Sequence, residues 1–406
     1  MGLNCRSCAK PLPDPFLDLG VHPLANNLCT SMDPHEDFRA PLHLVECPSC
    51  SLVQIDVAVH AGRMFSEYLY APGTSQTFVK HFNDLAGAVT AHMPSQVADG
   101  TVVDIGSNDG TLLTAFKALG WRRVIGVESA ANQCRRSNDR GIPTIHGFWP
   151  GSETIDQLGR GRVDVVTATN VFAHVADPVA FARAVGDILS IDGSFVIECP
   201  SLAVMYRDGT FDLCYHEHQS YFSVQAIRRV INRAGLVIYK VDSSPIHGGS
   251  LRVWACRPGR HVLLRDRKTV DEAIEAEIGF HGSCSTNARD RFAINAVHTA
   301  TAFRNAVRSQ RGIVAGYGAP AKAVTLIECA GLGMTDLAYI VDDNEMRQGK
   351  YLPGSHIPVV PSSALRDNRP AAVVIFPWNI VEDILPRLPT GIRVIVPMPK
   401  IRVIET

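Results

Sequence analysis

Two CxxC pairs stand near the start of the chain, Cys5 with Cys8 and Cys47 with Cys50. Zinc in structural sites takes four soft ligands in a tetrahedron, and each CxxC turn supplies two thiolates on a short loop. Because four protein ligands leave no open position for catalysis, the pattern predicts one structural Zn²⁺ in a closed site. A redox dithiol would need only one pair. A nucleic-acid-binding zinc ribbon should carry basic and aromatic residues between the pairs, and this chain carries few there.

The length and charge of the chain exclude several classes of protein. Its 406 residues are enough for two or three domains. With 39 basic and 40 acidic residues, it lacks the charge excess of a protein that grips nucleic acid through a large basic face. It has no apolar run of about 18 residues, so we expect no membrane span. Of its 11 cysteines, the seven outside the CxxC pairs are scattered and mostly flanked by apolar residues, which is typical of reduced thiols in a cytoplasmic enzyme.

A glycine-containing turn after the first long apolar run predicts a nucleotide-binding site. Residues 101–105 read as a buried parallel strand, and the turn 106–110 leads into a helix. Small residues there let the backbone approach a ligand at the start of the helix. The spacing is not GxGxxG, so a dinucleotide fingerprint is absent. The next strand, 123–128, ends in Glu128, where a carboxylate can accept both ribose hydroxyls.

The strand order extends this pattern toward the class I fold of S-adenosylmethionine (SAM) methyltransferases. Further strands are expected at 145–146, 163–170 and 194–198, and the segments 236–242 and 251–256 can form a closing antiparallel pair. An ordinary α/β turn with a buried acid is the alternative interpretation. The expected SAM-binding residues are Asp104, Gly106, Asn108, Asp109, Glu128, Phe148 and Asn170.

The densest polar cluster, residues 214–223, follows the fifth strand of this sheet. It should therefore lie at the edge where ligands bind in open α/β sheets. His174 follows the fourth strand and should lie at the same edge. Alone it would be read as a hydrogen-bonded core histidine, but beside a second histidine it is an acid/base candidate. A solvated loop is the alternative for the cluster.

The last third of the chain predicts a helical linker and a second Rossmann-like unit. Residues 259–310 have helical periodicity. Strands are then expected at 312–318, 337–341, 372–376 and 392–396, with a helix at 321–330. Bound NAD is disfavoured because Gly316-x-Gly318 lacks the third glycine of the fingerprint. The domain either contacts substrate or is purely structural.

Together these features resemble the nucleotide-sugar C-methyltransferases of deoxysugar biosynthesis, the family of tetronitrose C-3-methyltransferase. The motifs that carry the resemblance, beside the two CxxC pairs, are Asp18-Leu19-Gly20 with Pro23-Leu24-Ala25-Asn26, Tyr68-x-Tyr70 before Gly73-Thr74-Ser75, Tyr215-x-Glu217-His218, Phe222-Ser223, His247-Gly248-Gly249-Ser250 with Arg252, Gly316-Tyr317-Gly318-Ala319 with Lys322, and Lys350 with Leu352-Pro353-Gly354 and Ile357-Pro358. The resemblance implies an α/β protein with a zinc domain (1–75), a class I SAM methyltransferase domain (76–258), a helical linker (259–310) and a C-terminal Rossmann-like domain (311–406).

The resemblance also implies catalytic roles. His218 is the expected general base, with a near-neutral pKa, and Tyr215 is its neighbour, able to hydrogen-bond the enolate oxygen. Glu217 orients or polarises this pair. His174 faces the same pocket as a second acid/base, and Tyr70 closes the site from the N-terminal side. Such groups suit removal of a proton alpha to a ketone, followed by methylation of carbon.

The acceptor implied by the resemblance is a nucleotide-linked keto sugar, with no nucleic acid or membrane partner. The expected substrate-binding residues are Tyr68, His247, Gly248 and Lys322, and Lys350 and Arg347 could also meet its phosphates. A non-sugar acceptor, a zinc-binding protein with degenerate enzyme domains, and a nicotinamide-dependent oxidoreductase are the alternatives. The sequence gives no oligomeric state.

Overall fold

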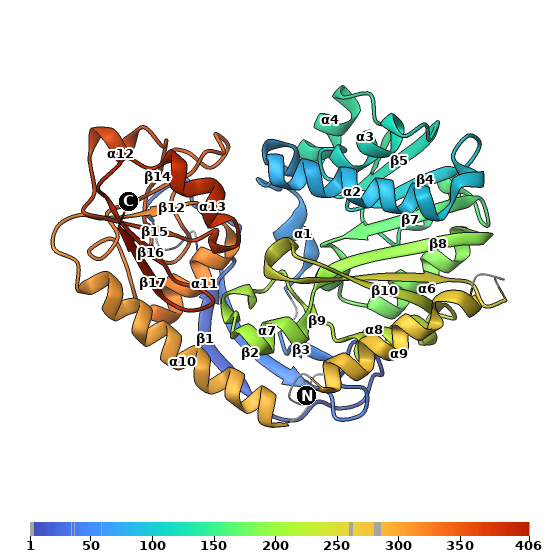
Figure 1. Cartoon of the computed structure of the whole chain (residues 1–406), viewed down its shortest axis with the longest axis horizontal. Helices are drawn as coiled ribbons and strands as arrows, with labels where there is room; N and C mark the ends of the chain where they lie inside the picture. Colours follow the sequence, from blue (N-terminus) through green and yellow to red (C-terminus); the bar gives the residue numbers. More distant parts are fainter. Residues whose placement is uncertain are drawn as a thin grey trace.

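The computed structural model describes residues 4–33, 35, 37–57, 59–259, 263–279 and 286–405. These residues form three parts (Figure 1): an N-terminal sheet at the bottom of the view, a large sheet with its helices on the right, and a smaller α/β unit on the left. Across the described ranges, no helix combines the length and the apolar character that crossing a membrane requires.

The N-terminal sheet takes its fourth strand from the middle of the chain. Its strands are β1 (Leu17–Pro23), β2 (Arg39–Glu46), β3 (Val53–Ile55) and β9 (Ser220–Tyr221), and they pair antiparallel in that order. Strands β2 and β3 flank the second CxxC turn. Strand β9 lies within the polar cluster expected to be catalytic, so this sheet anchors that cluster.

The central sheet has the class I methyltransferase order expected from the sequence. Its strands are β4 (Thr101–Ile105), β5 (Arg123–Glu128), β6 (Thr144–His146), β7 (Val163–Thr169), β8 (Leu189–Pro200), β10 (Val237–Ser244) and β11 (Ser250–Cys256). The spatial order is β10-β11-β8-β7-β4-β5-β6, and β11 runs antiparallel to both of its neighbours. The seven strands that the sequence predicts are therefore confirmed, within a few residues at their ends.

Helices cover both faces of the central sheet, because its strands are apolar on both sides. Helices α2 (Gln76–His92) and α3 (Thr111–Ala118) share one buried cluster, and α6 (Pro178–Ile188) and α8 (Val224–Arg233) share another. The remaining helices of this half are α1 (Ala61–Phe65), α4 (Ala131–Asp139), α5 (Ser152–Leu158) and α7 (Leu202–Asp208). Short 3₁₀ helices occur at η2 (Pro72–Thr74), η3 (Pro94–Gln96), η4 (Phe172–His174), η5 (Phe211–Leu213), η6 (Ile246–Gly248), η7 (Trp378–Ile380) and η8 (Leu385–Arg387).

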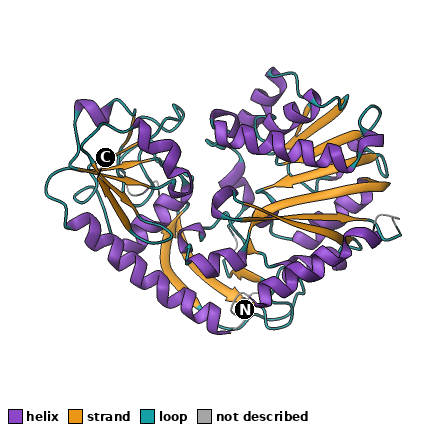
Figure 2. Cartoon of the chain, viewed as in Figure 1, coloured by secondary structure: helices purple, strands orange, loops and turns teal. Residues whose placement is uncertain are grey.

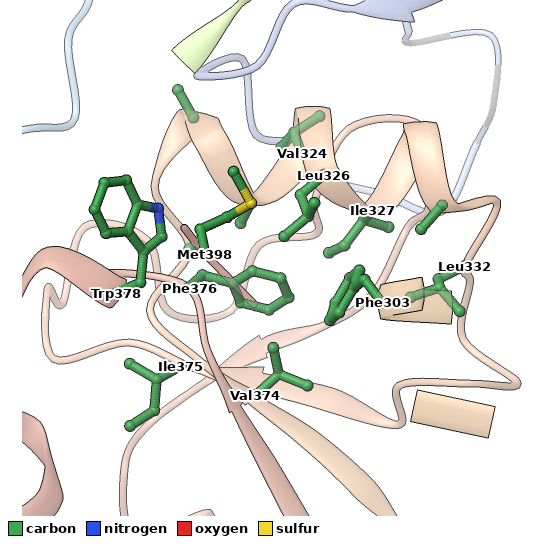
Figure 3. Packing of buried hydrophobic residues seen from close by; sticks show 14 of the residues in the cluster. Phe303, Val324, Leu326, Ile327, Leu332, Val374, Ile375, Phe376, Trp378 and Met398 are labelled. Carbon is green, nitrogen blue, oxygen red and sulfur yellow. The ribbon is translucent and has the colours of Figure 1, made fainter. Parts of the chain in front are cut away.

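The C-terminal unit is a second α/β layer structure. Its strands are β12 (Val314–Tyr317), β13 (Tyr339–Val341), β14 (Val359–Val360), β15 (Ala372–Ile375), β16 (Arg393–Val396) and β17 (Arg402–Glu405), and its helices are α11 (Ala321–Ala330), α12 (Ala364–Asp367) and α13 (Val381–Ile384). The order is β14-β13-β12-β15-β16-β17, with only β17 antiparallel among these six. Apolar side chains of α11 pack onto Phe376 and Phe303 (Figure 3), whose rings meet edge-on at 6.2 Å.

Two helices run along the base of the molecule between the larger units (Figure 2). Helix α9 (Leu263–Gly279) packs against β10, whereas α10 (Thr286–Arg308) packs against α7 and α11. The N-terminal part also contacts the C-terminal unit directly, because β1 lies against α11. The helical character of this segment is confirmed over α9 and α10, and the exact domain limits at 75, 258 and 310 stay predictions.

Candidate active site

The four cysteines of the CxxC pairs form one cluster. All four Sγ atoms lie within 4.8 Å of one another, with Cys5 and Cys50 at 3.4 Å and Cys8 and Cys47 at 3.5 Å. Tetrahedral zinc with Zn–S bonds of about 2.3 Å would hold its sulfurs about 3.8 Å apart. The thiolate set therefore fits Zn²⁺ with little movement, and it leaves no position for substrate.

A cavity of about 580 Å³ lies at the carboxyl edge of the central sheet. The loops after its parallel strands form one wall, and the N-terminal and C-terminal parts form the others. Of the residues expected in the site, the cavity wall includes His218, Tyr215, His174, Tyr70, Asp104, Gly106, Asn108, Glu128, Phe148, Asn170, Tyr68, His247 and Lys322. Glu217, Asp109 and Gly248 are not part of this wall.

The turn after β4 brings bare backbone to the cavity. Gly106 has φ +72°, and a Cβ there would lie 2.9 Å from a methyl group of Val171. Nearby, the Ser107 hydroxyl and the Asn170 side-chain oxygen are buried and have no hydrogen-bond partner among the residues that the structure describes. Buried polar atoms without partners are costly, so these two are poised to bind a ligand. Ser107 was not among the expected site residues.

The carboxylate of Glu128 joins the loops after β4 and β5. It accepts the backbone N–H of Asn108 at 2.8 Å and that of Ala130 at 2.7 Å. Burial raises its pKa, and these hydrogen bonds act against the shift. Asp104 lies deeper and accepts the hydroxyl of Thr167 at 2.6 Å, and burial raises its pKa to about 7. Glu128 therefore presents oxygen atoms to the cavity at a fixed position.

Asp109 lies outside the cavity and holds a neighbouring segment. Its carboxylate accepts the backbone N–H of Gly73 at 3.1 Å and the hydroxyl of Thr111 at 2.6 Å, and it pairs with Arg140 at 3.0 Å. The adjacent Asn108 donates its side-chain amide to the carbonyl oxygen of Tyr70 at 3.0 Å. The turn after β4 thus fixes the stretch that carries the N-terminal tyrosines.

His218 and Tyr215 form a hydrogen-bonded pair on the cavity wall. Nδ1 of His218 lies 2.7 Å from the carbonyl oxygen of Leu213, and Nε2 lies 2.9 Å from the Tyr215 hydroxyl. Because a carbonyl oxygen only accepts, Nδ1 carries the proton, and the lone pair of Nε2 accepts the hydroxyl of Tyr215. Burial lowers the pKa of His218 to about 4, below the near-neutral value expected for the base. The imidazole is therefore neutral at physiological pH.

Two further aromatic groups surround this pair. The ring of His174 stacks between Phe65, at 5.5 Å, and His218, at 5.2 Å between centroids. Burial holds the pKa of His174 well below its ordinary value. The buried hydroxyl of Tyr70 has no hydrogen-bond partner within the described part of the chain. Both groups are uncharged and face the same space as His218.

Glu217 is not part of the cavity wall and bonds a residue of the N-terminal part. Its carboxylate accepts the side-chain amide of Asn26 at 2.5 Å. Burial raises the pKa of Glu217 to about 7, and hydrogen bonds from Asn26 and Tyr68 act against that shift. Since Asn26 and Tyr68 themselves line the cavity, Glu217 supports the wall from behind. Asn26 lies in a motif of the resemblance, but nothing in the sequence pairs it with Glu217.

The C-terminal unit contributes cations to the wall. Lys322 at the start of α11 hydrogen-bonds Asn379 and lies 4.5 Å above the ring of Trp378, and burial lowers its pKa to about 8. Arg347 is buried and pairs with Asp342 at 3.2 Å, and it lines the same cavity. Lys350 is not part of this wall. The two cations therefore face the space that also contains His218.

The loop before β11 completes the cavity wall beside the C-terminal unit. The ring of His247 lies 5.1 Å from that of Phe78, and burial lowers the pKa of His247 to about 3. Gly248 has φ +88°, and the ring of Trp378 occupies the space that a Cβ would need. Gly248 thus permits close packing of this loop on the C-terminal unit, while His247 faces the cavity.

Three family models match successive parts of the chain. They are described as a zinc binding domain (residues 5–65), a methyltransferase domain (78–241) and a C-methyltransferase C-terminal domain (245–399). The chain is also 32% identical over 416 aligned residues to the C-methyltransferase NovU of Streptomyces niveus, covering 99% of this chain and 97% of the relative. The chain belongs to this C-methyltransferase family. This C-methyltransferase is thus a SAM-dependent enzyme with a zinc-binding N-terminal domain.

Two further similarities each cover less than half of the chain. A ubiquinone biosynthesis O-methyltransferase of Methylobacterium sp. (strain 4-46) is 27% identical over 179 residues, which cover 40% of this C-methyltransferase and 70% of that protein. The structure of a SAM-dependent methyltransferase from Mesorhizobium loti covers 42% of this chain and 96% of its own, with 18% identity and a TM-score of 0.35. Similarity at that level says nothing about the acceptor.

Proposed function

We propose that this C-methyltransferase deprotonates the carbon alpha to a ketone in a nucleotide-linked (TDP) keto-deoxysugar and methylates that carbon. The observation that carries the proposal is the hydrogen-bonded His218–Tyr215 pair on the cavity wall, in which Leu213 fixes the tautomer of His218 and leaves Nε2 unprotonated. Buried cations stand on the C-terminal wall of the same cavity, where the phosphates of a nucleotide would be neutralised.

In this proposal His218 is the general base. The C–H bond alpha to the ketone breaks, its proton goes to Nε2, and the electron pair delocalises onto the ketone oxygen. The resulting imidazolium keeps its Nδ1 hydrogen bond to Leu213, and the negative enolate beside it raises the low pKa of the imidazole. The hydroxyl of Tyr215 turns from Nε2 toward the enolate oxygen, and the partnerless hydroxyl of Tyr70 is the second available donor.

SAM, when bound, supplies the methyl group that the substrate carbon takes up. Gly106 would let the backbone come close to the cofactor, Glu128 would accept its ribose hydroxyls, and the unpaired side-chain oxygen of Asn170 would accept a further hydrogen bond. Phe148 lines the cavity and is 46% exposed, and its ring is available to stack on the adenine of SAM. His174 contributes a neutral imidazole stacked on His218 and is available as the second acid/base of the site.

The sugar nucleotide is assigned to the other half of the cavity. Lys322 and Arg347 suit its phosphates, and Tyr68 and His247 border the sugar. We place the reaction in deoxysugar biosynthesis within secondary metabolism, and in the cytoplasm. The described cysteines form no disulfide, which agrees with a reducing compartment.

The test is mass spectrometry of reactions that contain methyl-labelled SAM and a panel of nucleotide-linked 4-keto-6-deoxy sugars in deuterated water. We expect a labelled methyl group on one sugar, and deuterium at its alpha carbon even without SAM. Methylation without prior exchange would contradict the base-first order. If SAM binds but no sugar in the panel exchanges or is methylated, the acceptor is a non-sugar small molecule.

A further inference from the structure

A second group of metal-ligating side chains lies where the N-terminal part meets the C-terminal unit. Cys29 and Asp37 come from the connection between β1 and β2, and His356 comes from the turn before β14. One ligand atom of each lies within 4.8 Å of the other two. The Cys29 Sγ is 3.0 Å from one oxygen of Asp37, and Nε2 of His356 is 3.1 Å from the other.

Backbone contacts hold the three side chains in this arrangement. Cys29 and Tyr351 form an antiparallel bridge with two N–H···O contacts of 2.9 Å. The backbone N–H of Gly354 donates to the carboxylate of Asp37 at 2.8 Å. His356 has φ 52°, a left-handed conformation that few residues other than glycine adopt. The turn is therefore built so that it presents this imidazole to the N-terminal loop.

His356 has ring nitrogens without hydrogen-bond partners. The residue is 9% exposed. In the part of the chain that the structure describes, neither Nδ1 nor Nε2 makes a hydrogen bond, although Nε2 lies 3.1 Å from a carboxylate oxygen of Asp37. Leaving a buried polar group without a hydrogen bond is unfavourable. A bound cation would satisfy Nε2 and would balance the carboxylate beside it.

We propose that Cys29, Asp37 and His356 bind a second Zn²⁺ ion, separate from the four-cysteine site. Thiolate, imidazole and carboxylate are the ligand types that zinc takes in proteins. Tetrahedral zinc would place neighbouring ligand atoms about 3.3–3.5 Å apart, and one ligand atom of each of the three side chains already lies within 4.8 Å of the other two. The fourth position is left to water. The ion joins a loop of the N-terminal part to a turn of the C-terminal unit, and so it clamps two walls of the active-site cavity.

The test is the zinc content of the purified full chain, measured by inductively coupled plasma mass spectrometry after equilibration with Zn²⁺. We expect two zinc ions per chain. Mild chelation should remove one of them first, because a site with three protein ligands binds more weakly than four thiolates. The variants Cys29→Ser and His356→Ala should retain one ion and bind the second at least roughly 100-fold more weakly. The exposed His298 on α10 gives the matched control, and His298→Ala should keep two ions.

A single zinc ion in the wild-type chain under these conditions overturns the proposal, as does unchanged affinity in both variants. Melting temperatures give a second test that does not depend on how well the Cys29 and His356 variants fold. After mild chelation, added Zn²⁺ should raise the melting temperature of the wild-type chain but not that of Asp37→Asn, which preserves the shape of the side chain. An equal rise in both chains would instead place the ion elsewhere.

Discussion

The carboxylate of Asp109 accepts a hydrogen bond from the backbone N–H of Gly73 at 3.1 Å, and this contact ties the chain before α2 to the turn after β4. Residues 68–74, here called the strap, include two tyrosines of the cavity wall, Tyr68 and Tyr70. The strap is also held through its tyrosine carbonyls, which accept the side-chain amide of Gln133 at 2.6 and 3.1 Å. Asp109 can therefore influence the cofactor pocket without lining it.

Replacing Gly73 by alanine should loosen the strap. A Cβ at this position would lie 2.6 Å from the Asp109 carboxylate and 2.8 Å from the Thr111 hydroxyl, so the strap must move away. We expect the Kd for SAM, measured by calorimetry, to rise about tenfold, or roughly 1.4 kcal/mol. Gly87 on α2 has open space around it and gives the control, because Gly87→Ala should leave the Kd unchanged. Equal effects of both variants would show that the strap is not involved.

Removing the imidazole of His218 should abolish chemistry and spare cofactor binding. General base catalysis contributes roughly 10²–10⁴-fold, so kcat of His218→Ala should fall by that factor. Tyr215→Phe keeps the ring but removes the donor to the enolate oxygen, and a smaller loss is expected. Single-turnover rates and SAM calorimetry measure the two effects separately. Loss of SAM affinity in His218→Ala would assign this residue to the cofactor site instead.

The buried position of His218 predicts an acid-shifted pH profile. Its pKa in the folded chain is about 4, lowered from 6.5 by burial, so deuterium exchange at the alpha carbon should weaken only below about pH 5. The unfolded chain takes up this proton more readily, so the contribution of His218 to stability is complete above about pH 6.5 and declines toward pH 4. Comparing urea unfolding of wild type and His218→Asn between these pH values isolates the effect. If the rate of deuterium exchange instead fell with an apparent pKa near 6.5, His218 would not be the buried, neutral base.

We expect the affinity for the acceptor to change at alkaline pH because of Lys322. Burial lowers its pKa to about 8, so as pH rises through 8 the ammonium is lost and phosphates bind less well. KM for a nucleotide-linked acceptor should rise above pH 8 while kcat stays nearly constant. In Lys322→Met, KM should be raised at every pH and should lose this dependence. Lys350→Met is the control, since Lys350 lies outside the cavity wall. If Lys350→Met has the larger effect, the phosphates bind elsewhere.

The strands and the zinc cluster could be predicted because their signals are local. The apolar run at 101–105 and the turn that follows it define a buried strand and a ligand-binding loop within a dozen positions. Two CxxC turns likewise carry their geometry in their own spacing. The cavity also gathers His174 and His218 because the carboxyl ends of parallel strands share one edge.

Contacts between distant segments could not be predicted in the same way. Strand β9 has only two residues, too few for any periodicity, and its pairing with β3 depends on tertiary structure. The Asn26–Glu217 hydrogen bond spans 191 positions, and one sequence offers no sign of it. The sequence therefore places Glu217 in the cavity beside His218, whereas in the structure it hydrogen-bonds Asn26 and does not belong to the cavity wall. The low pKa of His218 also follows from burial in the tertiary structure.

Loss of zinc from the four-cysteine site should disorder the catalytic cluster through β9. Val53 of β3 pairs with Tyr221, and the N–H of Ile55 donates to the carbonyl oxygen of Gln219 at 3.2 Å. Since binding of structural zinc is coupled to folding, Cys47→Ser should release the ion and weaken this pairing. Hydrogen exchange should then increase at residues 53–55 and 219–221 together, and activity should fall in parallel. Cys134→Ser, at a buried cysteine outside the cluster, is the control and should change neither. A zinc-free chain that keeps protection at both segments yet is inactive would mean that the metal takes part in the chemistry.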